Sequence, residues 1–187
     1  ERLARREREK KAAELYEEEI KSNGNEQKNS YKAYEIKEQL LDKKRFGKLR
    51  KASDIKAIVV HQTGATTAQS TINTFKTTGS AHYLVDKDGT ILRLVPDLYV
   101  AFHVGKPSSW VTNDNSIGIE FVGSYDRIPG VNNRVIYHDL TQQQKEAGKW
   151  LLKELMIKYS LSKDKIFRHP EVSKKQETEA QSVEYPD

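Results

Sequence analysis

The hydrophobic positions of the chain follow short, regular periods from residue 55 onward. The continuous apolar run "IKAIVV" (55–60) predicts a buried strand. The stretch "HYLVDKDGTILRLV" (82–95) predicts two strands joined by a turn at Asp86–Gly89. A further strand is predicted over "SIGIEFVG" (116–123), where apolar residues recur on one side. These segments together indicate a sheet.

Helical periods separate the strands. The stretch "ATTAQSTINTFKTTGS" (65–80) predicts a helix with Ile72 and Phe75 directed inward, and residues 140–160 predict a longer helix that Thr141 can cap. Because strands and helices alternate, the sequence predicts an α/β fold with a mixed central β-sheet flanked by helices. The buried stripe expected of the long helix consists of Ala147, Leu151, Leu152, Leu155, Met156 and Tyr159.

The first 52 residues differ in composition from the rest of the chain. Residues 1–22 are strong helix formers with few apolar positions, and the sequence "NGN" ends that segment. Residues 28–46 predict a second helix with a thin apolar stripe. We therefore expect a charged N-terminal helical extension or linker over 1–52, whose helices would dock another protein or domain, and a globular domain over 53–187.

Composition restricts the class of protein. Residues 1–50 hold 15 Lys and Arg against 11 Asp and Glu, so they carry +4 of the net charge of +5. Basic and aromatic residues do not gather on one face there, so no nucleic-acid partner is expected. No apolar run approaches the roughly 20 residues of a membrane span. The chain has no cysteine, which excludes disulfides and thiolate metal ligands.

The candidate metal-binding residues are histidines at the ends of predicted elements. His61 follows the first strand of the domain and His169 follows the long helix, and α/β sheets gather their sites at such places. Two imidazoles and one carboxylate hold zinc and leave a fourth position for water. The carboxylate is expected near His169, where Glu171, Glu177 and Glu179 are available.

Five motifs carry a resemblance to a known family. In chain order they are "IVVHQTG", "SAHYLVDKDGTILRLVPD", "AFHVG", "NSIGIEFVG" and "RHPEVSKKQETE". Over about residues 55–180 the chain resembles the type 2 zinc-dependent N-acetylmuramoyl-L-alanine amidases, which include phage endolysins, recycling amidases and peptidoglycan recognition proteins. The resemblance implies that a zinc-activated water hydrolyses the amide between N-acetylmuramic acid and L-alanine in peptidoglycan. It also implies a secreted or cell-envelope location, or a phage-encoded lysis protein.

The resemblance assigns roles to particular residues. His61 and His169 match the two histidine ligands of zinc. The third ligand is Glu177 under the spacing of phage endolysins and Glu179 under that of recycling amidases, and the family has Asp or Cys there. Glu120 matches the general base. The functional lysine is Lys175 under the spacing of phage endolysins, whereas under the spacing of recycling amidases the lysine position holds Glu177, a departure from the family; we assign the role to Lys175. The residues matched to the substrate groove are His82, His103, Trp110 and Asn115.

Other functions remain open at this level. Some peptidoglycan recognition proteins bind muropeptide without cutting it, and a third ligand that reaches the metal separates the two cases. A basic N-terminal interaction segment and a zinc hydrolase for other amides are further alternatives.

Overall fold

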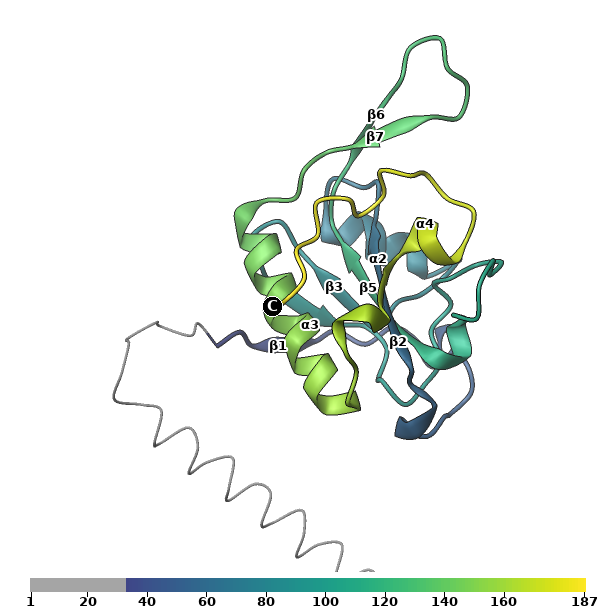
Figure 1. The fold of residues 1–187 in the computed structure, drawn as a ribbon, viewed down its shortest axis with the longest axis vertical. Coiled ribbons are helices and arrows are strands. Elements are labelled where there is room, and N and C mark those ends of the chain that lie inside the picture. The colour runs from purple at the N-terminus through teal and green to yellow at the C-terminus, as the bar shows by residue number, and fades with distance from the viewer. Residues whose placement is uncertain (1–32) are drawn as a thin grey trace, which may run out of the picture. The chain divides into compact units, whose positions relative to one another are not determined.

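A mixed sheet of six strands lies at the centre of the fold (Figure 1). The computed structural model describes residues 33–187, of which Tyr34–Asp187 form one compact unit. The order β1-β4-β3-β5-β2-β8 is parallel except for the β3–β4 hairpin. The predicted fold class is therefore confirmed. The strands are β1 (Ile36–Glu38), β2 (Ala57–Gln62), β3 (Tyr83–Val85), β4 (Ile91–Arg93), β5 (Ser116–Phe121) and β8 (Ile166–Arg168).

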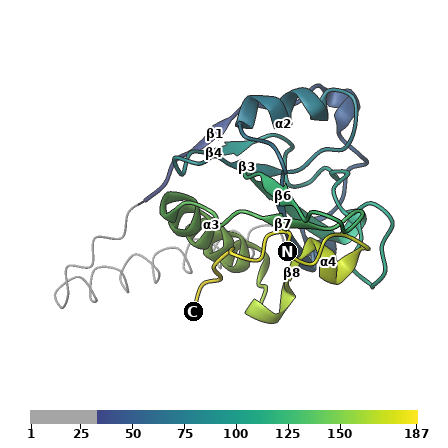
Figure 2. The ribbon, with the colours of Figure 1, turned by 90° about the horizontal axis from the view of Figure 1, so that it is seen from above.

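Helices cover both faces of the sheet (Figure 2). Because side chains alternate along a strand, Leu84 packs towards α2 (Ala68–Phe75), whereas Tyr83 and Val85 pack towards α3 (Gln142–Tyr159). The core is thus divided into an α2 side and an α3 side. Within the described residues, no helix is both long and apolar enough to cross a membrane.

The helix boundaries follow their caps. Thr67 Oγ1 accepts a hydrogen bond from the Ser70 amide at 3.1 Å, so α2 begins later than the predicted residue 65. Thr141 caps α3 as predicted, with its Oγ1 3.1 Å from the Gln144 amide. The remaining helical segments are α4 (His169–Val172) and the 3-10 turns Lys43–Arg45, Ala52–Asp54, Asn113–Asn115 and Lys163–Lys165.

The helix predicted over 28–46 is wrong in its described part, and residues 28–32, like the helix predicted over 1–22, lie outside the described residues. The chain is extended at β1, where Ile36 pairs with Ile91 in parallel register. Tyr34 and Ile36 alternate inward against the core, so the period is that of a strand. The boundary expected at residue 53 thus falls inside the compact unit, which begins at Tyr34 and whose sheet includes β1.

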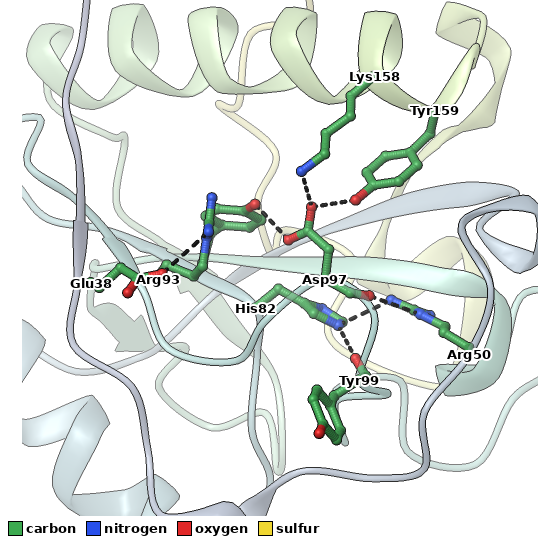
Figure 3. Close-up of polar contacts among 9 residues, drawn as sticks. Glu38, Arg50, His82, Arg93, Asp97, Tyr99, Lys158 and Tyr159 are labelled. Carbon is green, nitrogen blue, oxygen red and sulfur yellow. Dashed lines mark hydrogen bonds and ion pairs between the residues drawn. The ribbon is translucent and has the colours of Figure 1, made fainter. Parts of the chain in front are cut away.

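Arg50 anchors this early segment under the sheet (Figure 3). Its guanidinium is buried, and its Nη1 donates to the backbone oxygen of Ser116 at 2.8 Å. Its Nε donates to the backbone oxygen of Asp97, whose carboxylate accepts from Tyr83, Lys158 and Tyr159. The network therefore ties the first described segment to β3, β5 and α3.

A two-stranded hairpin that the sequence did not predict follows β5. It consists of β6 (Tyr125–Arg127) and β7 (Val135–Tyr137) and rises beyond the end of the central sheet (Figure 1). The rings of Tyr125 and Tyr137 contact each other edge to face at its base, with centroids 5.2 Å apart. The hairpin stands beside the C-terminal loop that follows α4.

Candidate metal centre

Three ligand atoms converge at the carboxyl ends of the central strands. Glu179 Oε1 lies 2.9 Å from His169 Nδ1 and 3.7 Å from His61 Nδ1. The three ligand atoms lie within 4.8 Å of one another, and all three residues are buried. Two imidazole nitrogens and one carboxylate oxygen form a donor set that suits zinc.

The parallel register of β2 explains why the histidines meet. Val60 pairs with Arg168, so the next residues along the two strands, His61 and His169, are neighbours. Their rings lie 4.2 Å apart between centroids. On the other side of β2, His61 pairs with Glu120 of β5. The sheet therefore places a carboxylate beside the histidine pair.

The structure separates the two candidates for the third ligand. Glu179 is 5% exposed and contacts both histidines. Glu177 is directed away from them: its side chain is 86% exposed and lies 3.7 Å from Arg134 Nη2. Of the two, Glu179 is the one whose carboxylate can reach a metal at this place.

Side chains of the metal loop, which we define as residues 173–180, bind it to the hairpin. Gln176 accepts from the Val135 amide at 3.1 Å. Thr178 Oγ1 accepts from the Tyr137 amide at 3.2 Å and donates to the Val135 carbonyl at 3.0 Å. Residues 176 and 178 thus point to the hairpin, and Glu179 follows immediately. The position of Glu179 therefore depends on contacts with the hairpin.

Glu120 is a half-buried residue whose carboxylate has one buried oxygen. Its Oε2 has no hydrogen-bond partner among the described residues. Burial and then the negative charge of Glu179 raise the pKa of Glu120 to about 8, while Lys175 acts in the opposite direction. An unpartnered buried oxygen beside three converging donors is chemically suited to a proton that comes and goes.

Lys175 lies on the exposed side of the centre. Its Nζ would be 4.0 Å from a Cβ built on Gly105. Its positive charge contributes to lowering the pKa of both His61 and Glu120. The predicted base and the predicted lysine are thus brought to the same centre.

Burial keeps the first histidine uncharged. The pKa of His61 lies well below its usual value, because burial disfavours the imidazolium and because His169, His103 and Lys175 lie nearby. A neutral imidazole has a nitrogen lone pair to offer to a metal. The protonation state of His61 therefore fits zinc.

The residues predicted to line the substrate groove are distributed differently. His82 is 0% exposed and lies under the sheet, where its Nδ1 accepts from the Gly118 amide. His103 is 7% exposed and lies behind His61, with its Nδ1 2.9 Å from His61 Nε2. Because both side chains are buried, they are suited to packing and to orienting their neighbours, and not to direct contact with substrate in an open groove.

Trp110 and Asn115 lie nearer the surface. Trp110 is 52% exposed and contacts Phe167 edge to face. Asn115 accepts from the Thr112 amide and donates to the Trp110 carbonyl, so it shapes the turn that carries Trp110. The structure therefore presents Trp110 to solvent and uses Asn115 to hold the backbone.

Sequence reasoning missed a tyrosine at the centre. Burial, followed by the charges of Glu179 and Glu120, raises the pKa of Tyr137, whose amide donates to Thr178 Oγ1 beside Glu179. Tyr137 belongs to the hairpin, and no motif marks it. A period-2 run "VIY" just before "HDLT" was the one available signal, and it is too short to stand out.

The comparisons identify the family. A sequence profile described as N-acetylmuramoyl-L-alanine amidase matches residues 51–181. The chain belongs to this family. A search among curated protein sequences found no match.

Solved structures share the fold. AmiD from E. coli, in complex with the substrate anhydro-N-acetylmuramic acid-L-Ala-D-γ-Glu-L-Lys, is 24% identical with a TM-score of 0.57, and the match covers 70% of this chain and 58% of AmiD. AmpDh3 from Pseudomonas aeruginosa, in complex with anhydromuramic pentapeptide, is 23% identical with a TM-score of 0.57, over 78% of this chain and 57% of AmpDh3. The amidase LysC from Clostridium intestinale URNW is 23% identical with a TM-score of 0.51, over 75% and 87%. The chain thus spans less than two thirds of the first two relatives.

Proposed function

We propose that this protein hydrolyses the amide bond between N-acetylmuramic acid and L-alanine in peptidoglycan, and that it depends on zinc. The observation that carries the proposal is the convergence of His61, His169 and Glu179 beside the unpartnered carboxylate of Glu120. Membership of the amidase family supports the choice of substrate.

His61, His169 and Glu179 would hold the zinc ion. When bound, zinc supplies a Lewis acid for the amide carbonyl and lowers the pKa of a coordinated water to about 7. The donor set fits, since two buried imidazole nitrogens and one carboxylate leave a fourth position for solvent or substrate.

Glu120 would act as the general base. It would accept a proton from the attacking water at its free Oε2 and return it to the leaving nitrogen. The pKa of this carboxyl is about 8 without a cation, and a nearby divalent cation lowers it, towards the range in which a carboxylate can both accept and release a proton at neutral pH.

Lys175 would stabilise the negative charge that develops on the carbonyl oxygen. Support comes from its positive charge, which acts on both His61 and Glu120, and from the exposure of its side chain. A single positioned donor of this kind contributes about 3–4 kcal/mol of transition-state stabilisation. Trp110, exposed at the surface, would border the bound glycan or peptide.

Muropeptides are the substrate class that we extend to this chain from AmiD and AmpDh3, whose complexes contain them. We further propose that the protein acts at the cell envelope, after secretion or as a phage lysis protein, because that is where the polymer is found.

The experiment is a product assay on purified peptidoglycan. The zinc-loaded protein should release new amino-terminal L-alanine, and this activity should stop on chelation and return with zinc. His61→Ala is the matched inactive variant. Binding of muropeptide without any new amino terminus would contradict the proposal and favour a binding module.

A further inference from the structure

His103 occupies a place that the amidase chemistry does not itself explain. It is buried behind His61, and its ring packs directly over Gly118, where an added Cβ would lie 2.5 Å from the His103 ring. A glycine at this position of β5 is therefore needed for space, since any side chain would displace the imidazole. The fold reserves room for this ring.

A chain of hydrogen bonds gives the His103 ring a direction. The Ser116 hydroxyl donates its proton to the Thr112 carbonyl, so its oxygen can only accept from His103 Nε2, which is 3.1 Å away. A neutral His103 that donates from Nε2 has a free lone pair on Nδ1. That lone pair accepts from His61 Nε2 at 2.9 Å.

The same chain determines which nitrogen of His61 is available. If Nε2 of His61 carries the proton, then Nδ1 does not, and Nδ1 is the atom that faces Glu179 at 3.7 Å. The carbonyl of Thr112, which can only accept, therefore sets the tautomer of His61 through two intervening side chains.

His169 is oriented by Val104, the residue that follows His103. Its Nε2 donates to the Val104 carbonyl at 3.0 Å, which leaves Nδ1 free to face Glu179. The backbone of this segment is itself held, because Asn113 Oδ1 accepts from the amides of both His103 and Val104, at 3.0 and 2.8 Å. The dipeptide His103–Val104 thus accepts a hydrogen bond from each of the two histidines, His61 and His169.

Arg50 holds the turn that contains Asn113 and Ser116. Its Nη1 donates to the carbonyls of Asn113, Asp114 and Ser116. The turn that carries the Asn113 amide and the Ser116 hydroxyl is therefore held by a buried guanidinium.

We propose that His103 is a positioning residue, which sets the tautomer and orientation of His61 so that Nδ1 faces the metal position, and that Val104 and Asn113 do the same for His169. The proposal rests on the proposed zinc site. Histidine ligands in metal sites usually donate their second nitrogen to a carboxylate, a carbonyl or water, whereas here His61 donates to a second imidazole whose own tautomer is fixed.

The test compares His103→Leu with His103→Gln. Leucine removes both hydrogen bonds, whereas a glutamine amide can accept from His61 and donate to Ser116. Loss of an outer partner of this kind typically weakens metal binding 10- to 100-fold. We expect His103→Leu to weaken zinc binding by about that factor, measured by chelator competition, and His103→Gln to restore most of it. Equal losses in the two variants would show that ring packing alone matters, and would overturn the proposal.

A second measurement does not depend on the folding of a variant. Imidazole ¹⁵N shifts of the metal-free wild-type protein should show His61 protonated at Nε2 and not at Nδ1. In Ser116→Ala, the loss of the fixed acceptor should allow the other tautomer to be populated. A His61 ring protonated at Nδ1 in the wild type would contradict the proposal.

Failure of the amidase proposal has a different signature. A protein that binds zinc with the expected His103 dependence but releases no L-alanine would retain the positioning role and lose the proposed reaction. A protein that cleaves peptidoglycan with normal zinc affinity in His103→Leu would do the reverse.

Discussion

The metal centre is assembled from two regions that the fold holds in different ways. His61, His169 and Glu120 lie on or directly after neighbouring parallel strands, where the backbone register itself makes them neighbours. Glu179 and Lys175 lie on the metal loop, whose contacts to the hairpin come from the side chains of Gln176 and Thr178. One part of the site is therefore fixed by the sheet, and the other by contacts between two loops.

The two regions contribute different residues to the centre. The sheet region contains the two histidines proposed as ligands and the glutamate proposed as the base, close to the core of the domain, where substitution disturbs packing. The loop region contains Glu179, the proposed third ligand, and Lys175, and side-chain hydrogen bonds join it to the hairpin. Variants in the two regions should consequently separate metal retention, turnover and stability.

Removal of the loop carboxylate should have the largest effect. Glu179→Ala leaves two imidazoles, which we expect to hold zinc weakly, so both bound metal and amidase activity should be lost. The matched control is Glu177→Ala, which removes an exposed carboxylate two residues away. Zinc analysis and the L-alanine assay on both proteins check this. A zinc-free Glu177→Ala beside a zinc-loaded Glu179→Ala would reverse our assignment.

Substitution of Glu120 in the sheet region should lower turnover without loss of bound zinc. Glu120→Gln removes the base but no ligand, so zinc should remain while the turnover number falls by about 10²- to 10⁴-fold. Glu154→Gln, on the exposed face of α3, is the control. Full activity of Glu120→Gln at normal zinc content would remove Glu120 from the reaction.

The pH dependence of stability should report on the same carboxyl. In the metal-free protein, the folded-state pKa of Glu120 is about 8, against 4.5 as its ordinary value. A raised pKa means that the stabilising contribution of Glu120 is complete below about 4.5 and is lost as the pH rises through 8. Denaturant unfolding of the metal-free protein should therefore show a decline over this interval that Glu120→Gln reduces. An unchanged slope in the variant would argue against a buried, unpaired carboxyl.

The smallest effect should come from the link between the loop and the hairpin. Thr178→Val removes the hydroxyl that joins Val135 and Tyr137, while Thr178→Ser retains it. We expect the valine variant to lose about 1–2 kcal/mol in free energy of unfolding and a few-fold in zinc affinity. Titration with a zinc chelator and denaturant unfolding measure both. If serine and valine behave alike, the hydroxyl does not position the loop.

The sequence predicted the sheet region well, for a physical reason. His61 and Glu120 belong to strands whose apolar period is strong, and strand ends in α/β folds are where sites form. The roles expected of Glu120 and His169 came from the resemblance to the amidase family, and β8, the strand that places His169 beside His61, was not predicted.

The loop region could not be predicted to the same depth. The choice between Glu177 and Glu179 depends on which of them turns towards Arg134, and that is decided by hydrogen bonds to a hairpin some 40 residues earlier in the chain. Local spacing contains no such information. The hairpin itself has strands of three residues each, too short to give a period.

The first segment shows a different limit. Charged helix formers around Ile36 favoured a helix, but pairing with Ile91 and the burial of Tyr34 and Ile36 decided for a strand. Arg50 was likewise indistinguishable from the other basic residues nearby. Its importance comes from carbonyls that only the folded chain brings together.

The central claim is a zinc ion held by two histidines and Glu179, and the most direct measurement is X-ray absorption at the zinc edge of the purified protein. The account predicts about one zinc ion per chain, with two imidazole nitrogens at about 2.0–2.1 Å and oxygen in the remaining positions, the carboxylate oxygen being lost in Glu179→Ala. A protein that binds no zinc after loading, or one whose zinc shell is the same in Glu179→Ala, would contradict it.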